Sequence, residues 1–528
     1  MNPHNPQTLT ELLVRRVAAG GVAILDRDKP ISADALYAES RCVAQGLHDL
    51  GVRVGDRVAI WLPNVPAWLA CFFAVARLGG IAVAVNTRFR SSEVADIVGR
   101  SGATMLIYWP GYRGIDFEGI LNDAGAEALR GLTALVAYDE AAAPPSTRTV
   151  MGCQTKSYRD LVACPPYAHD HARANLGCLI FTTSGTTRLP KFVLHHQASI
   201  ASHAAEAARG FGYGDADACT LLTVPMCGTF GMSNALAPLA GARPLVMMPT
   251  FEARAAARAI KQYTVTHFPA SGDIVAQLCD ASPEPIPYPS VRMVLGARAG
   301  QAKAADERGL RLIGIYGSSE MQAVLSRQSE HTSADQRELG GGKLITAATQ
   351  VRARDTASGQ ILAHGEQGEL EFKGPSCMME YYGNPDATAA AFTADGFFRS
   401  GDLGYTVAEG EYVFLSRIGD VLRLSGFLVN PLEIEAVLDT HPAVAAIQVV
   451  GIEGPRGPQP VAFVVPNHKQ AIDEAALIAH CKKQIAHFKV PHHVLTITAF
   501  PFTPSANGNK IQKAKLREMA VAALRDAL

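Results

Sequence analysis

The sequence lacks an excess of either charge, because 49 aspartate and glutamate residues balance its 48 lysine and arginine residues. The formal net charge is −1, so no general electrostatic attraction to nucleic acid is expected. Paired cysteines are also absent: the ten cysteines are scattered, without a C-x-x-C pair or a Cys/His cluster at zinc-ligand spacing. Because the N-terminus shows no signal-peptide pattern, we expect reduced thiols in a cytoplasmic protein.

No uninterrupted apolar segment reaches the length that a membrane-spanning helix requires. The longest candidate covers 67–85, and Arg77 and the pair Gly79-Gly80 interrupt it. Since a glycine pair favours a turn, this segment predicts a buried helix that ends near Leu78, followed by a buried strand.

Helix-like and strand-like patterns alternate over 30–110 and return after 245. Short apolar strands that alternate with helices are typical of layered α/β folds with parallel strand pairing. After Asp420 the pattern predicts two helices and two strands, which suits a separate small α+β domain. We therefore expect a large α/β domain over 1–418, built from layered subdomains, and a small α+β domain over 419–528.

A loop between two predicted strands is rich in hydroxyl groups and reads TTSGTTRLPK over 182–191. Its backbone N–H groups, its hydroxyls and the Lys191 cation suit the phosphates of a nucleotide. The loop is not a Walker A motif, because Pro190 replaces the second glycine and Phe192 replaces the magnesium-binding hydroxyl. An ordinary serine- and threonine-rich turn is the alternative.

Five segments, in chain order, resemble signature motifs of the adenylate-forming superfamily, which includes acyl-CoA synthetases, luciferases and nonribosomal-peptide adenylation domains. They are TTSGTTRLPK (182–191), GIYGSSE (314–320), GFFRSGD (396–402), SRIGDVLRLSGFLVNPLEIE (416–435) and TPSANGNKIQKAKLR (503–517). The resemblance covers nearly the whole chain. It implies an enzyme that converts a carboxylic acid and ATP to acyl-AMP and pyrophosphate, with a small domain that moves between the two half-reactions.

The resemblance also implies roles for individual residues. Contacts with ATP or AMP are implied at Thr183, Ser184, Gly185, Thr186, Thr187, Lys191, Tyr316, Gly317, Ser318, Ser319, Glu320, Asp402, Arg417 and Lys510. The catalytic residues among them are Lys510, Glu320, Thr183 and Lys191. The hinge falls at Gly419, where the conformational freedom of glycine would ease the domain movement.

Several of these roles have an alternative. Lys510 would bridge the carboxylate and the α-phosphate, but SANGNK is one residue longer than the usual motif, so Lys513 is the second candidate. Glu320 is a hard carboxylate that suits Mg²⁺, or it complements a helix dipole. Tyr316 would lie on the adenine or act as a core aromatic residue. Asp402 would accept hydrogen bonds from the ribose hydroxyls, or simply occupy a turn.

The expected acyl pocket departs from the family pattern, in which an aromatic residue and a histidine occupy the positions of Cys227 and Gly228. The pocket residues are Met226, Cys227, Gly228, Phe230 and Gly296. Loss of two rings predicts a larger or branched acyl group, unless Phe230 or Met226 refills the space. Nearby, Asp273 either pairs with a substrate amine or caps a helix.

The leading prediction is an acyl-CoA synthetase that uses ATP, Mg²⁺ and coenzyme A, with a small-molecule acid as its partner. A stand-alone ligase that loads a carrier protein or an amine acceptor is the alternative, and a homodimer is compatible with either. A degenerate nucleotide-binding protein is the third candidate. This last candidate is favoured by four departures from the family motifs, Arg188, Phe192, Cys227 and Gly228. It is opposed by the four retained residues Glu320, Asp402, Arg417 and Lys510.

Overall fold

The computed structural model describes residues 5–140, 148–183, 190–270, 274–296, 302–356, 358–418, 422–425, 427–429, 431–454, 457–467, 472–505 and 508–525. Contacts between Cα atoms divide the chain into two units. The first consists of Met1–Thr87, Ile97–Thr182 and Phe192–Ile418, and the second of Arg88–Asp96, Thr183–Lys191 and Gly419–Leu528.

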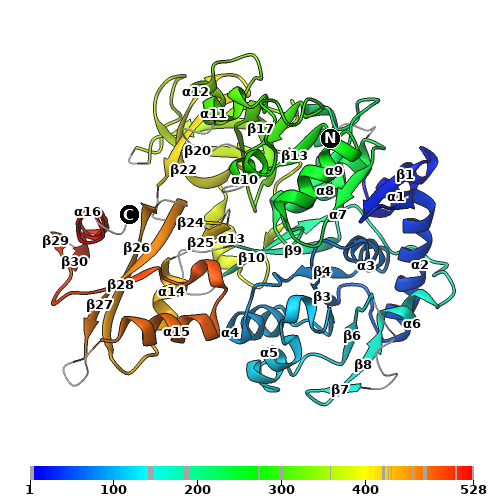
Figure 1. Ribbon diagram of the computed structural model, residues 1–528, viewed down its shortest axis with the longest axis horizontal. Coiled ribbons are helices and arrows are strands. Elements are labelled where there is room, and N and C mark those ends of the chain that lie inside the picture. The colour runs from blue at the N-terminus through cyan, green and yellow to red at the C-terminus, as the bar shows by residue number, and fades with distance from the viewer. Residues whose placement is uncertain are drawn as a thin grey trace. The chain divides into compact units, whose positions relative to one another are not determined.

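A nine-stranded sheet lies in the first unit. Its order is β21 (Glu380–Tyr381), β10 (Lys191–His196), β9 (Gly177–Thr183), β4 (Ile81–Ala84), β3 (Arg57–Trp61), β5 (Met105–Tyr108), β6 (Ala134–Ala137), β8 (Cys153–Ser157) and β7 (Arg148–Val150). From β9 to β8 the neighbouring strands pair in parallel. This confirms the pairing predicted from the alternation of strands and helices. Helix α3 (Pro66–Arg77) lies beside β3 and β4, and α2 (Ala33–Asp49) packs against α3 (Figure 1).

The segment 67–85 forms the elements that its sequence predicts. All residues of α3 are buried, and Leu78 caps its C-terminus. Gly79 follows with φ of 71°, a left-handed conformation that favours glycine, and β4 begins at Ile81. In the part of the chain that the structure describes, no helix is long and apolar enough to cross a membrane.

A second, seven-stranded sheet supplies the other face of the main core. Its order is β15 (Leu312–Ile313), β14 (Met293–Leu295), β13 (His267–Pro269), β11 (Thr220–Leu222), β12 (Leu245–Met247), β1 (Val22–Asp26) and β2 (Lys29–Ser32). Only the edge pair β1–β2 is antiparallel. Helices α8 (Thr229–Ala240) and α9 (Ala253–Gln262) contact its strands.

The third sheet is fully antiparallel, and no sequence pattern predicted it. Its order is β16 (Ile315–Ser318), β17 (Gln322–Arg327), β18 (Gly340–Leu344), β23 (Glu411–Arg417), β22 (Phe398–Ala408), β20 (Gly368–Lys373) and β19 (Gln350–Arg354). Strands far apart in the sequence are neighbours here, for example β18 and β23. Three of the motifs from the sequence analysis lie on this sheet.

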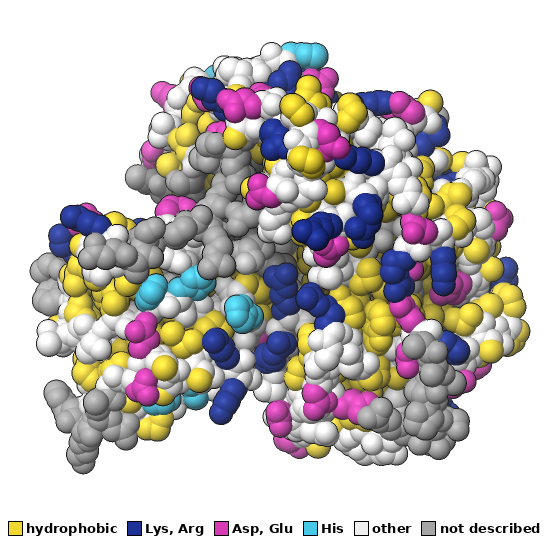
Figure 2. Space-filling model, viewed as in Figure 1, with side chains coloured by type: hydrophobic (Ala, Val, Ile, Leu, Met, Phe, Trp, Pro, Cys, Tyr) yellow, Lys and Arg dark blue, Asp and Glu magenta, His cyan; other side chains and the backbone are white. Residues whose placement is uncertain are grey.

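The remaining helices are short or connect the sheets. They are α1 (Leu9–Ala18), α4 (Ser91–Val94), α5 (Phe117–Ala124), α6 (Tyr158–Val162), α7 (Gln197–Gly210), α10 (Ile274–Asp280), α11 (Ala302–Glu307), α12 (Ala334–Arg337) and α13 (Pro385–Ala391). On the visible surface, side chains of both charges are interspersed (Figure 2), in keeping with the near-zero net charge.

The second unit contains a small α+β fold, as the sequence predicts. Strand β26 (Val444–Gly454) pairs antiparallel with β27 (Gly457–Pro466), which pairs in parallel with β28 (His493–Thr496). After residue 430 its helices are α14 (Pro431–Leu438), α15 (Glu474–Gln484) and α16 (Lys513–Ala523). Two hairpins complete it, β24 (Leu422–Leu424) with β25 (Phe427–Val429) and β29 (Phe502–Ser505) with β30 (Gly508–Ile511). The mixed α/β fold class is therefore confirmed.

Candidate active site

The motif GIYGSSE forms β16 and the turn that leads into β17. A Cβ atom at Gly317 would lie 2.2 Å from the carbonyl oxygen of Gln322, so no larger residue fits there. Gln322 has φ of 65°, in the left-handed region that non-glycine residues rarely adopt. This tight turn places Glu320 in a buried position, with 6% of its surface exposed.

Contacts from one neighbouring segment hold Glu320. The hydroxyl of Tyr381 donates a hydrogen bond to Oε1 of Glu320 at 2.8 Å, and the backbone N–H of Met378 donates to its carbonyl oxygen at 2.6 Å. None of the described residues donates a hydrogen bond to Oε2 of Glu320. One carboxylate oxygen is therefore oriented by Tyr381, and the other is available to a cation.

This donor set fits Mg²⁺ held jointly with a nucleotide. Mg²⁺ keeps several waters and binds proteins through one or two carboxylates plus substrate phosphates. Within the described residues, no group of three or more His, Cys, Asp and Glu side chains is arranged to hold a metal ion. A single oriented carboxylate at Glu320 is what a shared site of this type requires.

Tyr316 and Asp402 meet across the third sheet. The Tyr316 hydroxyl donates a hydrogen bond to Oδ2 of Asp402 at 2.5 Å, and both residues are buried. Asp402 on β22 is the register partner of Arg417 on β23. The fold thus brings together three predicted nucleotide contacts that are separated by up to about a hundred residues in the chain.

The Tyr316 ring also belongs to a cluster of aromatic residues. It stacks on Phe372 with ring centroids 5.2 Å apart. Its centroid also lies 5.5 Å from the Tyr412 ring, in an edge-to-face contact, and 5.5 Å from the tilted Phe414 ring. These contacts favour the alternative of a core aromatic residue. The contact of Tyr316 with adenine stays a prediction.

His195 is an unexpected neighbour of the Glu320 turn. Its Nε2 lies 2.7 Å from the carbonyl oxygen of Ser319, and the side chain is completely buried. Burial lowers the pKa of His195 to about 4, so the imidazole is neutral at pH 7. Since a carbonyl can only accept, the single ring proton must be on Nε2.

The hydroxyl-rich loop lies partly outside the described residues. Thr183 is the last residue of β9 and Lys191 is the first of β10, whereas Ser184, Gly185, Thr186, Thr187 and Arg188 are outside the described part. Phe192 is buried with 1% exposure, and the Arg100 guanidinium lies 4.0 Å from its ring centroid. Phe192 therefore packs inward, and its bulk fills the sheet core.

The predicted acyl-pocket segment is anchored by Asn64, a residue that the sequence analysis did not identify. Nδ2 of Asn64 donates to the carbonyl of Val224 at 2.9 Å, and Oδ1 accepts from the N–H of Met226 at 2.9 Å. Asn64 is buried, so the two bonds hold the backbone on both sides of Pro225.

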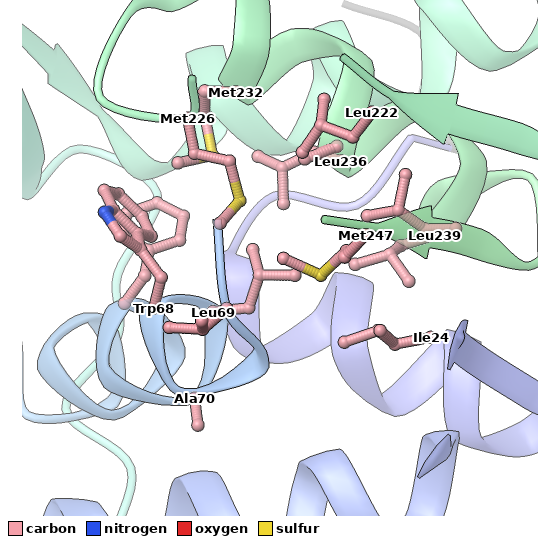
Figure 3. Packing of buried hydrophobic residues seen from close by; sticks show 14 of the residues in the cluster. Ile24, Trp68, Leu69, Ala70, Leu222, Met226, Met232, Leu236, Leu239 and Met247 are labelled. Atoms are coloured by element: carbon pink, nitrogen blue, oxygen red, sulfur yellow. The ribbon is translucent and has the colours of Figure 1, made fainter. Parts of the chain in front are cut away.

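Met226 and Phe230, the two residues that could fill the space of the absent aromatic and histidine rings, differ in their burial. Met226 is fully buried in the main core, where it lies next to Met232 and near Trp68 (Figure 3). Phe230 is only partly buried, and its Cζ lies 3.8 Å from a Cβ atom built on Gly296. By contrast, among the described residues the nearest atom to a Cβ built on Gly228 is the Pro225 oxygen at 3.9 Å, so these residues leave the space beside Gly228 open.

The predicted catalytic lysine lies on the second unit. Lys510 is on β30, where its register partner is Thr503 on β29. The second candidate, Lys513, begins α16, and its Nζ lies 3.6 Å from a carboxylate oxygen of Glu435. The catalytic role of Lys510 rather than Lys513 stays a prediction. Gly419 and Asp273, the predicted hinge and the predicted amine contact, lie outside the described residues.

Comparison with known proteins decides the family. The model of the family described as "AMP-binding enzyme" matches residues 14–382, and the model described as "AMP-binding enzyme C-terminal domain" matches residues 433–507. The chain belongs to the AMP-binding enzyme family. It is therefore an enzyme of the adenylate-forming type, as the five motifs predict.

Relatives of this AMP-binding enzyme include CoA ligases. It is 30% identical to a methyl-dioxo-octahydro-indenyl-propanoyl:CoA ligase of Mycobacterium tuberculosis, over 94% of this chain and 95% of the relative. Its fold is similar to that of an o-succinylbenzoate CoA synthetase variant from Bacillus subtilis, solved with a product analogue (TM-score 0.81, 23% identity, 96% and 98% of the chains). It is also similar to an amide bond synthetase from Marinactinospora thermotolerans (TM-score 0.79, 24% identity, 96% and 99%).

Three side chains of this AMP-binding enzyme were missed by sequence reasoning: Asn64, His195 and Tyr381. Each acts on a segment at least 61 residues away in the chain. The only available signal was chemical, since histidine and asparagine in apolar segments need a hydrogen-bond partner when buried.

Proposed function

We propose that this enzyme activates a bulky or medium- to long-chain carboxylic acid with ATP, and then transfers the acyl group to coenzyme A. The substrate carboxylate would attack the α-phosphorus, giving acyl-AMP and pyrophosphate. Attack on the adenylate by the CoA thiol would then release AMP and the thioester. The grouping of Tyr316, Asp402 and Glu320 around one sheet, in a chain of this family, is the observation that carries the proposal.

The chemistry brings anions together, so the site must neutralise charge as it develops on pyrophosphate. Mg²⁺ bound at Glu320 would supply part of this neutralisation. Asp402, oriented through Tyr316, would accept hydrogen bonds from the ribose hydroxyls, and Arg417 would act beside it. Lys510 would stabilise charge between the carboxylate and the α-phosphate, with Thr183 and Lys191 on the pyrophosphate side.

The nature of the acyl group is inferred from the segment 225–231. Open space beside Gly228, together with the small side chain of Cys227, supports a substrate wider than one enclosed by a histidine and an aromatic ring. The relative named for a bicyclic propanoyl:CoA substrate is consistent with this proposal.

Gly228→His is expected to narrow the range of accepted acids. An imidazole would occupy the open space, so turnover of bulky acids should fall by about tenfold or more, a loss typical of one misplaced substrate contact. Small acids should be activated near the wild-type rate. The measurement is pyrophosphate exchange over acids of increasing width, with Gly228→Ala as the matched control. An unchanged substrate range in the His variant would contradict the proposal.

The domain roles follow from the same proposal. Residues 1–418 would bind ATP and the acid, and 419–528 would carry Lys510 and rotate at Gly419 between the two half-reactions. The ten cysteine thiols fit a cytoplasmic enzyme.

The proposed function is tested by carboxylate-dependent exchange of pyrophosphate into ATP. Fatty, aryl, bulky alicyclic and amino acids are screened, and the active acids are then assayed with CoA, a carrier protein and amines as acceptors. We expect exchange with bulky or longer acids and release of AMP with CoA. Product with an amine alone would identify an amide-forming ligase instead. No exchange with any acid would support the degenerate nucleotide-binding protein.

A further inference from the structure

The turn that carries Glu320 is bound on its second side by the segment at the end of β10 and the start of α7. Nε2 of His195 donates to the carbonyl of Ser319 at 2.7 Å. In return, Nε2 of Gln322 donates to the carbonyl of Ser199 at 3.0 Å. These bonds lie on either side of Glu320, so the turn cannot rotate without breaking at least one of them.

The surroundings of His195 hold its ring in one orientation. Its Nδ1 lies 3.4 Å from the Ser199 hydroxyl, which donates to the carbonyl of His196 at 2.9 Å. The ring also contacts Phe181, with centroids 6.1 Å apart and an interplanar angle of 72°. A completely buried ring that donates from Nε2 and packs against Phe181 has little rotamer freedom, so its N–H points steadily at Ser319.

The bond to Ser319 acts directly on Glu320. The Ser319 carbonyl belongs to the peptide group that also contains the Glu320 nitrogen, and this group is planar. Holding that oxygen sets the direction in which the Glu320 chain continues. Met378 and Tyr381 then hold the carbonyl and Oε1 of Glu320. Together these contacts define the direction of the remaining carboxylate oxygen.

We propose that His195 is a positioning residue, which orients the carboxylate of Glu320 toward the Mg²⁺ of bound Mg²⁺–ATP by holding the Ser319–Glu320 peptide. The proposal rests on the role given to Glu320 in the proposed function. His195 touches neither substrate nor metal in this scheme. Its effect is transmitted through a single donated hydrogen bond, so a donor of similar reach should replace it.

The test is calorimetric measurement of the Kd for ATP, with and without Mg²⁺ and without any acid. His195→Leu removes the donor, and its Kd for Mg²⁺–ATP should rise by about 10- to 100-fold, as for lost groups that orient metal ligands. Its Kd for ATP without Mg²⁺ should stay near the wild-type value. His195→Gln, whose amide nitrogen has the reach of Nε2, should restore most of the affinity for Mg²⁺–ATP.

His267→Leu is the matched control. His267 is also a buried neutral histidine, but it lies on β13 of the second sheet and bonds to Thr266. Its replacement should lower the melting temperature as His195→Leu does, without a Mg²⁺-dependent change in Kd. If His195→Leu does not fold, His195→Asn replaces it in the Kd measurements. The asparagine side chain is polar but too short to reach the Ser319 carbonyl oxygen.

The outcomes separate the two proposals. If the wild-type protein binds ATP equally well with and without Mg²⁺, the role of Glu320 fails, and the positioning role fails with it. If Mg²⁺ strengthens wild-type binding but the Leu and Asn variants match the wild type, only the positioning role of His195 is overturned. The positioning role is also overturned if the affinity of the Leu variant for ATP falls equally with and without Mg²⁺. That result would indicate that His195 has a purely structural role.

Discussion

Lys510→Ala is expected to lower carboxylate-dependent pyrophosphate exchange by about 10²- to 10³-fold, the usual cost of removing one group that stabilises transition-state charge. Transfer from pre-formed acyl-AMP to CoA should continue near the wild-type rate, because that step involves no pyrophosphate departure. The two half-reactions are measured separately, by isotope exchange and by thioester formation.

Lys513→Ala is the control, because Lys513 is three residues away and forms an ion pair with Glu435. Its exchange rate should remain within a few-fold of wild type, since its Nζ pairs with Glu435 and not with a substrate in this scheme. The reverse result, with Lys513 essential and Lys510 dispensable, would show that the inserted residue in SANGNK shifts the motif toward the second lysine.

Acidification is expected to destabilise the first unit steeply below pH 6.5. Burial lowers the pKa of His195 to about 4, of His203 to about 3 and of His267 to about 4, from an ordinary value of 6.5. The unfolded chain therefore binds protons at these residues before the folded chain does. Their stabilising contribution is complete above pH 6.5 and is lost as the pH falls toward 4.

The expected size of this pH effect follows from the linkage between proton binding and unfolding. Three histidines that protonate only in the unfolded state contribute a slope of about 4 kcal/mol per pH unit between roughly pH 6 and pH 4. The free energy of unfolding is measured with urea at several pH values in this range. His203→Gln and His267→Gln should each reduce the slope by about one third.

His331→Gln serves as the control for these variants, because the His331 side chain is 87% exposed. Its slope should equal that of the wild type. Equal slopes for the wild type and the two buried-site variants would show that these rings do not remain neutral in the folded protein.

Individual helices and strands could be predicted from the sequence because the patterns that determine them are local. The apolar run from Ala67, the glycine pair after Leu78 and the strand from Ile81 appear as predicted. The strands on both sides of the hydroxyl-rich loop were also correctly predicted, as was the small α+β fold after Asp420. Periodicity and turn chemistry act over a few residues, so one sequence is enough to read them.

The strand pairing of the antiparallel third sheet could not be predicted from such local patterns. Its strands pair across long stretches of chain, as β18 and β23 do, and each short strand by itself is compatible with several partners. The motifs nevertheless identified Tyr316, Asp402 and Arg417 as a group, because the family resemblance carries information about the folded site that periodicity lacks.

The motifs alone were enough to establish the family and the adenylate-forming chemistry, and they predicted the residue types that would meet the nucleotide. The side chains that orient these residues became visible in the folded chain: Tyr381 bonds to Glu320, Tyr316 to Asp402 and His195 to Ser319. The physical reason is that a hydrogen bond between residues 61 to 124 positions apart leaves no periodic trace in the chain. It forms only where folding buries both partners together, so that each bonds to the other instead of to water.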